Sequence, residues 1–90
     1  MENKKALAQI NRDLESNNFN ISAHALERMS QRDLTAIDIV TLIERGLKEP
    51  IWNHKHESWN FTGFGLAGEP FTIACAYEKD GTLIVTVFWE

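Results

Sequence analysis

The spacing of apolar residues along this chain changes near Pro50, and this change limits the folds that the chain can adopt. Before Pro50, apolar residues recur at the spacing of an amphipathic helix, as Leu7, Ile10 and Leu14 do. After Pro50 the period becomes two, and aromatic and β-branched residues replace helix formers. Helices followed by consecutive strands predict an α+β domain, with N-terminal helices packed on a four-stranded, mainly antiparallel sheet.

Polar caps and a glycine mark the ends of the predicted helices. Ser22 precedes a run of helix formers and can cap the second helix. Thr35 is followed three residues later by Asp38, a capping-box pattern, and Gly46 is a natural stop. The predicted helices run from Lys4 to Ser16, from Ser22 to about Arg32, and from Thr35 to Gly46, with an extended link from Phe19 to Ile21.

Glycine, proline and charged residues separate the predicted strands. The segment from Lys79 to Thr82 indicates a hairpin, because its Asp-Gly pair accommodates the positive φ values of a tight turn. The predicted strands are Ile51 to His54, Ser58 to Phe64, Phe71 to Tyr77 and Leu83 to Trp89. In this arrangement the helix residues Leu26, Met29, Ile37, Val40 and Ile43 should pack against the strand residues Ile73, Cys75, Val85 and Val87.

Length and charge restrict the classes of function. Ninety residues suit one hydrophobic core, so residues 1–90 should form a single domain, with a first helix in 1–18 and the remaining core in 19–89. A net charge of −4 argues against a surface that wraps long nucleic acid. No apolar stretch reaches the roughly 20 residues that span a bilayer, so we expect a cytoplasmic protein without membrane contact. The lone Cys75 is expected to be a buried structural thiol.

Three basic residues, His24, Arg28 and Arg32, are spaced four residues apart and therefore share one face of the second predicted helix. Leu26 and Met29 on the neighbouring face can anchor this helix in the core. Two guanidiniums within one turn repel each other unless an acidic side chain or an external anion compensates, which favours a phosphate ligand. The alternative is a solvated helix face, because short patterns of this kind occur by chance.

Two segments of the chain carry a family resemblance. They are ISAHALERMSQRDL, from Ile21 to Leu34, and IVTVF, from Ile84 to Phe88, and they resemble the bacterial family known as domain of unknown function 4258 (DUF4258). The resemblance covers about Phe19 to Trp89, and Met1 to Asn18 fall outside its strongest part. It implies a fold similar to the RelE and colicin-type ribonuclease toxins. It also implies a toxin–antitoxin system whose antitoxin is a small zinc-finger protein.

The basic residues suit metal-independent cleavage of RNA, in which the ribose 2′-hydroxyl attacks the adjacent phosphorus. His24 would act as the base, since nearby cations favour its neutral form. Arg28 and Arg32 would bind the scissile phosphate. By resemblance Thr86 points towards that phosphate, although a residue that simply fills a strand is an equally good explanation. This chemistry requires no cofactor.

His54 and His56 alternate along an extended segment and should share a face with Trp52. Zinc is not predicted, because two imidazoles lack an obvious third ligand, so we expect no metal site. Instead, one imidazole could supply a second proton-transfer group, and Trp52 could stack on a base. Tryptophans also fill cores and interfaces, including those of a homodimer or an antitoxin complex. The rival function is a non-enzymatic interaction module, such as an antitoxin-like protein, an immunity protein or an inactive toxin homologue.

Overall fold

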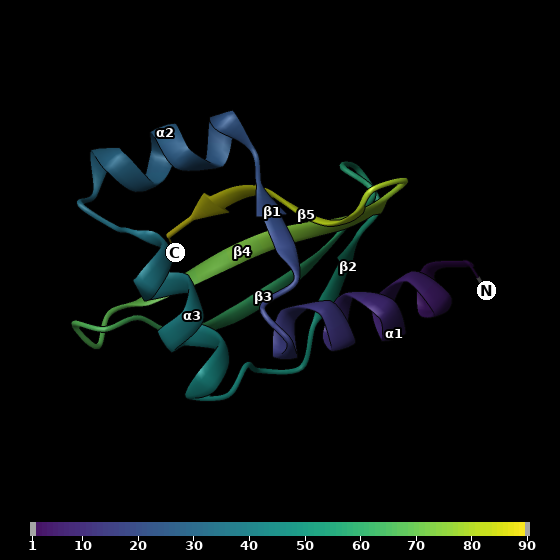
Figure 1. The fold of residues 1–90 in the computed structure, drawn as a ribbon, viewed down its shortest axis with the longest axis horizontal. Coiled ribbons are helices and arrows are strands. Elements are labelled where there is room, and N and C mark those ends of the chain that lie inside the picture. The colour runs from purple at the N-terminus through teal and green to yellow at the C-terminus, as the bar shows by residue number, and fades with distance from the viewer. Residues whose placement is uncertain (1, 90) are drawn as a thin grey trace.

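A computed structural model describes residues 2–89, which form three helices and five strands (Figure 1). The predicted helices are all present, and the strands of the second half lie close to their predicted bounds. In chain order the elements are α1 (Glu2–Glu15), β1 (Phe19–Ile21), α2 (Ala23–Gln31), α3 (Ala36–Glu44), β2 (Ile51–Asn53), β3 (Ser58–Phe64), β4 (Pro70–Glu78) and β5 (Gly81–Phe88).

The strands form one mixed sheet in the order β1-β5-β4-β3-β2. β1 pairs parallel with β5, and the other neighbouring strands pair antiparallel. The prediction of four strands is therefore wrong, because Phe19–Ile21 is a strand at the sheet edge and not a link. Three residues are too few to show an alternating pattern, and the partner strand is distant in the sequence. Local periodicity could not reveal this pairing.

Capping contacts confirm the predicted starts of α2 and α3. The Oγ atom of Ser22 accepts a hydrogen bond from the backbone N–H of Ala25 at 3.0 Å. The carboxylate of Asp38 accepts one from the backbone N–H of Thr35 at 2.9 Å. At the predicted hairpin between β4 and β5, Gly81 adopts a φ of +112°, a value that favours glycine.

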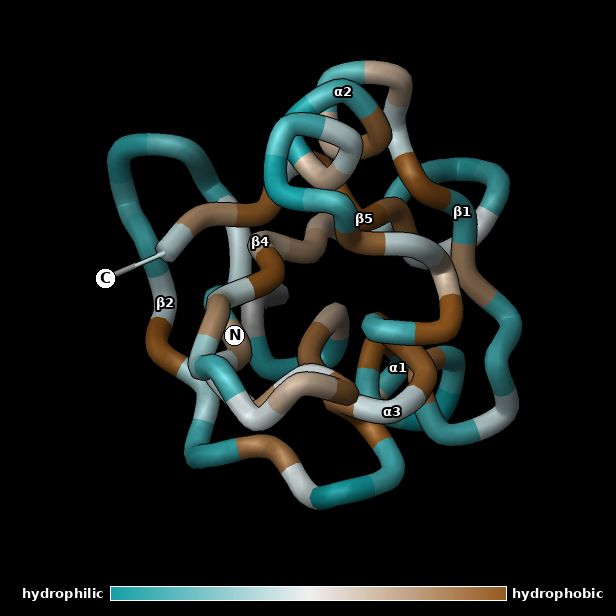
Figure 2. The backbone as a smooth tube through the Cα atoms, turned by 90° about the vertical axis from the view of Figure 1, so that its left-hand side faces the viewer, coloured by the Kyte–Doolittle hydropathy of each residue, from teal (hydrophilic) through white to brown (hydrophobic). Residues whose placement is uncertain are grey.

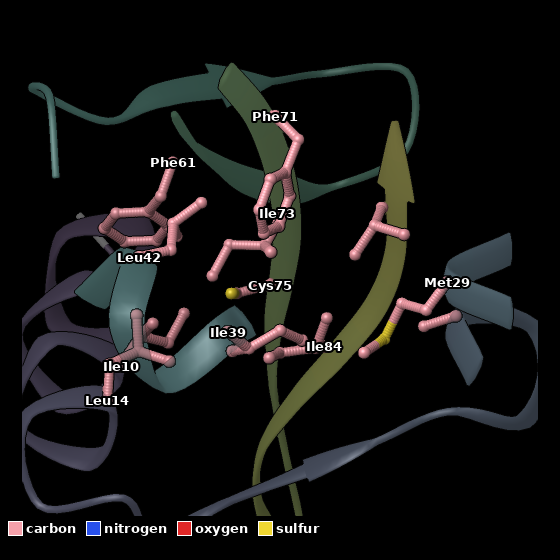
Figure 3. Close-up of a cluster of buried hydrophobic side chains, with 12 residues drawn as sticks. Ile10, Leu14, Met29, Ile39, Leu42, Phe61, Phe71, Ile73, Cys75 and Ile84 are labelled. Atoms are coloured by element: carbon pink, nitrogen blue, oxygen red, sulfur yellow. The ribbon is translucent and has the colours of Figure 1, made fainter. Parts of the chain in front are cut away.

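Two of the helices cover one face of the sheet, and the third packs along β5 (Figure 1). In Figure 1, α1 and α3 lie below the sheet and α2 lies above β5, and Figure 2, turned by 90°, shows the same separation. Figure 3 shows side chains of α1 and α3 packed towards the central strands. The buried core consists of Ile10, Leu14, Ala25, Met29, Ile39, Leu42, Phe61, Phe71, Ile73, Cys75, Ile84 and Val87. α1 and α3 therefore cover one face, and α2 packs along β5.

An irregularity in β5 decides which of its side chains point to the core. Ala74 pairs with Thr86 and Cys75 pairs with Ile84, so Val85 is an extra residue that forms a β-bulge. Ile84 is fully buried, whereas Val85 stays partly exposed. The prediction that Val85 packs in the core is wrong, because strict alternation does not anticipate an inserted residue.

Leu26 and Ile37 are 51% and 64% exposed, so the prediction that they pack on the sheet is wrong. In α2 the buried side chains are Ala25 and Met29, one turn apart, and Leu26 projects about 100° away from Ala25. In α3 the fully buried apolar residues follow Ile37 in the sequence. Of the other predicted core residues, four are buried, namely Met29, Ile73, Cys75 and Val87. Two more, Val40 and Ile43, are partly buried.

Candidate functional site

Polar side chains line the face of the sheet that points away from α1 and α3. Because Phe61 and Ile73 point into the core, alternation turns their neighbours to the opposite face. The residues on this opposite face are Asn60 and Thr62 of β3, Thr72 and Ala74 of β4, and Thr86 and Phe88 of β5. Two hollows lie among these residues, and they are the candidate binding sites of this face.

The first hollow has a volume of about 400 Å³ and brings together residues that are far apart in the sequence. Its lining includes His24, Asn53, His56, Asn60, Thr86 and Phe88, and we call it the His24 cleft. Three of the candidate site residues named from the sequence, His24, His56 and Thr86, therefore lie around one cavity. Imidazoles transfer protons near neutral pH, and the amides and the hydroxyl can donate hydrogen bonds to an anion.

His24 lies in the first turn of α2, and its position depends on the N-cap of this helix. The hydroxyl of Ser22 donates a hydrogen bond to the carbonyl oxygen of Val85 at 2.6 Å, and the backbone N–H of Ser22 donates to the carbonyl of Ile84 at 2.9 Å. These bonds fix the start of α2 to the bulged segment of β5. As a result, the exposed His24 lies beside Thr86 at the cleft.

His56 reaches the same cleft through the turn that joins β2 to β3. The side-chain oxygen of Asn53 accepts hydrogen bonds from the backbone N–H groups of Lys55 and His56, at 3.0 and 3.2 Å. Glu57 follows with a φ of +49°, which completes the reversal of the chain. Asn53 thus shapes the turn and also lines the cleft. Asn53 is not among the predicted site residues, although an Asn that precedes a polar segment is a known turn signal.

Trp52 and His54 do not belong to the lining of the His24 cleft. The indole N–H of Trp52 donates a hydrogen bond to Nδ1 of His54 at 3.1 Å, and the Trp52 ring packs on that of Trp59, with the ring centroids 5.3 Å apart. Trp52, Trp59 and Tyr77 line another hollow of about 530 Å³ beside α1, and His56 belongs to the lining of this hollow as well as to that of the cleft. The turn therefore directs its two histidines differently, and only His56 lines the cleft with His24.

The guanidiniums of Arg28 and Arg32 contact the end of β5 and the residue after it. Nε of Arg28 donates a hydrogen bond to the carbonyl of Val87 at 3.0 Å. The Arg32 guanidinium lies over the Trp89 ring at 4.4 Å from its centroid, and that of Arg28 lies at 5.9 Å. Neither arginine lines the His24 cleft. The three residues share one face of α2, but this does not bring the two arginines into the cavity that His24 lines.

The remaining candidate chemistry is limited in the described part of the chain. Residues 2–89 contain no group of three or more His, Cys, Asp or Glu side chains that could hold a metal ion. Burial raises the pKa of the Cys75 thiol well above its ordinary value, which keeps it protonated and unreactive. Within the same residues, no helix is both long enough and apolar enough to cross a membrane.

Comparison with known proteins yields one family. No curated protein and no solved structure matches the chain. A family model described as Domain of unknown function (DUF4258) matches residues 21–89, from the end of β1 to the residue that follows β5. The match includes α2 and β5, the elements that hold His24 and Thr86 at the cleft. It covers well over half of the sequence and agrees with the resemblance seen in its two segments, so the chain belongs to the DUF4258 family.

Proposed function

We propose that this protein is a metal-independent endoribonuclease that cleaves RNA through attack of the ribose 2′-hydroxyl. The observation that supports the proposal is that His24 and His56, from elements separated in the sequence, both line one cleft. Cleavage of this kind needs one group that accepts a proton and another that donates one. Two imidazoles are suited to both tasks near neutral pH.

In the proposed reaction, His24 removes the proton of the 2′-hydroxyl as its oxygen forms a bond to phosphorus. The bond from phosphorus to the 5′-oxygen breaks, and His56 gives its proton to that leaving oxygen. The products are a 2′,3′-cyclic phosphate and a 5′-hydroxyl. One amide N–H of Asn60 donates a hydrogen bond to a phosphate oxygen as negative charge develops there. The Thr86 hydroxyl, which lies a long 3.5 Å from the Val87 carbonyl, turns to donate a second one.

Arg28 has a positioning role in this proposal. Its bond to the Val87 carbonyl joins α2 to the last part of β5, next to Thr86. Together with the Ser22 bond to Val85, it holds His24 and Thr86 at a fixed separation. Catalysis depends on such fixed geometry, because small displacements of a proton-transfer group lower the rate strongly.

The biological setting is part of the same proposal and rests on the resemblance to the family. We infer a RelE-like toxin that acts on RNA in the cytoplasm and is inhibited by a small antitoxin of the zinc-finger type, as the resemblance implies. A small domain with a net charge of −4 suits a local contact with RNA better than an extended one. The fold relation and the partner are both open to direct test.

The test uses the purified protein with RNA and with DNA of the same sequence, in the presence of a chelator. We expect RNA cleavage that leaves cyclic phosphate ends and no cleavage of DNA, which lacks the 2′-hydroxyl. His24→Ala and His56→Ala should each lower the rate by about 10²-fold or more. His54→Ala is the matched control, because His54 bonds to Trp52 away from the cleft. Metal-dependent cleavage, equal cleavage of DNA, or full activity of His24→Ala would contradict the proposal.

A non-enzymatic interaction module is the second candidate, and the hollow beside α1 favours it. Trp52, Trp59 and Tyr77 line this hollow, and Tyr77 is 50% exposed. Aromatic side chains at a partly exposed surface are typical of protein interfaces, including those of homodimers. Light scattering over a range of protein concentrations tests the homodimer. A mass that remains that of one chain at all concentrations would show that this surface does not join two copies.

A further inference from the structure

The second hollow lies on the same face of the sheet as the His24 cleft, the face that points away from α1 and α3, and it adjoins that cleft. Its volume is about 320 Å³, its lining includes Lys48, Asn60, Thr62, Thr72 and Phe88, and we call it the Lys48 hollow. Asn60 and Phe88 line both cavities, so they form the boundary between them. A ligand that fills the cleft and extends along the face past this boundary enters the Lys48 hollow.

The boundary residues offer the two contacts that proteins use to hold an unpaired base. Phe88 supplies an aromatic ring, on which a base of any sequence can stack. The hydroxyl of Ser58 lies 3.4 Å from the side-chain oxygen of Asn60 and donates to it. This contact leaves both amide N–H groups of Asn60 as donors, one for the scissile phosphate and the other for an acceptor atom on the edge of a base.

The floor of the Lys48 hollow carries a pair of hydroxyls. Oγ1 of Thr62 and Oγ1 of Thr72 lie 2.8 Å apart, and one of them donates its proton to the other. The accepting hydroxyl keeps its own proton and can donate it to a ligand. Thr72 is 2% exposed and Thr62 is partly exposed, so a ligand in the hollow contacts the Thr62 hydroxyl, which the buried Thr72 holds in place.

Lys48 supplies the positive charge of this hollow. Its backbone N–H donates a hydrogen bond to the carbonyl of Thr62 at 2.9 Å, which fixes its place beside β3. The ammonium group lies 5.9 Å from the centroid of the Phe64 ring and is exposed. Glu49 also lines the hollow, so the local charge suits a single phosphate better than a run of phosphates.

We propose that the Lys48 hollow binds the one nucleotide that flanks the scissile phosphate, and this inference rests on the proposed ribonuclease function. The base stacks on Phe88 and its edge meets Asn60, while the phosphate of the same nucleotide pairs with Lys48. The substrate is therefore a short single-stranded segment of RNA, because a paired base could not reach the aromatic ring.

Binding is measured by fluorescence anisotropy with a short labelled oligonucleotide of 2′-fluoro RNA. Fluorine replaces the 2′-hydroxyl in this probe, so the proposed reaction cannot cleave it. Lys48→Met should weaken binding and make the fall of log K with log salt concentration shallower by about 0.7. This is the change expected when one phosphate contact with a single strand is lost. Lys55→Met is the matched control, because it removes the same charge from the turn between β2 and β3, at the hollow beside α1. Equal slopes for Lys48→Met and the unaltered protein would overturn the inference.

The aromatic contact is tested in the same assay. Phe88→Leu keeps an apolar side chain but removes the stacking surface, and it should weaken binding about tenfold. Tyr77→Leu, an equally drastic change on the opposite face, should leave binding unchanged. If the unaltered protein binds this probe through Lys48 and Phe88 but cleaves no RNA, the proposed reaction fails and the binding site stands. If it cleaves RNA and neither variant affects binding, the Lys48 hollow alone is excluded.

Discussion

Asp13 is the most buried acidic residue of the described chain, with 5% of its surface exposed. Its carboxylate accepts hydrogen bonds from the Gln9 amide at 2.9 Å and from the Thr82 hydroxyl at 2.8 Å. Thr82→Val removes a donor from this buried carboxylate and should lower the free energy of unfolding by about 1–3 kcal/mol. Urea unfolding followed by tryptophan fluorescence measures the change. An unchanged midpoint would mean that the contact does not stabilise the fold.

Cys75 is fully buried, and burial raises the pKa of its thiol. Since the thiolate is the reactive form, a raised pKa leaves the thiol protonated at neutral pH and for some distance above it. Iodoacetamide should therefore label the native protein very slowly, and labelling should accelerate when urea unfolds the chain. Mass spectrometry measures the extent of labelling with time. Rapid labelling under native conditions would show that Cys75 is accessible.

The structure brings some of the candidate site residues together at one cavity and leaves others outside it. The family resemblance suggested that His24 and Thr86 face the same ligand, and both line one cleft. Helical spacing placed Arg28 on the same face as His24, but spacing alone says nothing of what lies opposite each residue. The partners of Arg28, the Val87 carbonyl and the Trp89 ring, come from the other end of the chain. Only the long-range packing of α2 on β5 could reveal them.

At the scale of elements, α2 lies beside the C-terminal part of β5, where β1 no longer pairs with it. β1 pairs with β5 only as far as Ile84, and beyond it the Ser22 side chain binds the Val85 carbonyl. Ser22→Ala removes this bond together with the cap of α2, so it should lower the free energy of unfolding by about 1–2 kcal/mol. Ser30→Ala in the exposed part of α2 is the control. Equal stabilities of the two variants, measured by urea unfolding, would contradict this role.

Elements with local signals were predicted well from the sequence. The capping pattern of Thr35 and Asp38 and the hairpin at Gly81 depend on residues within one turn of each other, and both are present. β1 and the bulge at Val85 depend instead on pairing between distant segments. Neither produces a pattern in a short stretch of sequence, so local periodicity predicts a link in place of the parallel strand and a core residue at Val85.

For the whole molecule, the sheet order predicts an uneven distribution of stability. β5 pairs with β4 along its length and with β1 as far as Ile84, and several of its residues lie in the core, whereas β2 is a three-residue edge strand. Backbone amides of β4 and β5 should therefore exchange with solvent most slowly, and those of β2 should exchange much faster. Hydrogen exchange followed by NMR measures these rates. Equal protection of β2 and β5 would indicate that the sheet opens only as a unit.

The place of β5 between β1 and β4 also has a consequence for the synthesis of the chain. β5 contacts β1, β4 and α2, yet it follows all of them in the sequence. While the ribosome translates this chain, the earlier segments emerge with apolar faces that have no permanent partner. Ala25 and Met29 of α2 remain in this condition until β5 has left the exit tunnel. During that interval, the apolar faces of α2 and β1 are the surfaces to which a chaperone would bind, and the folded protein covers these faces.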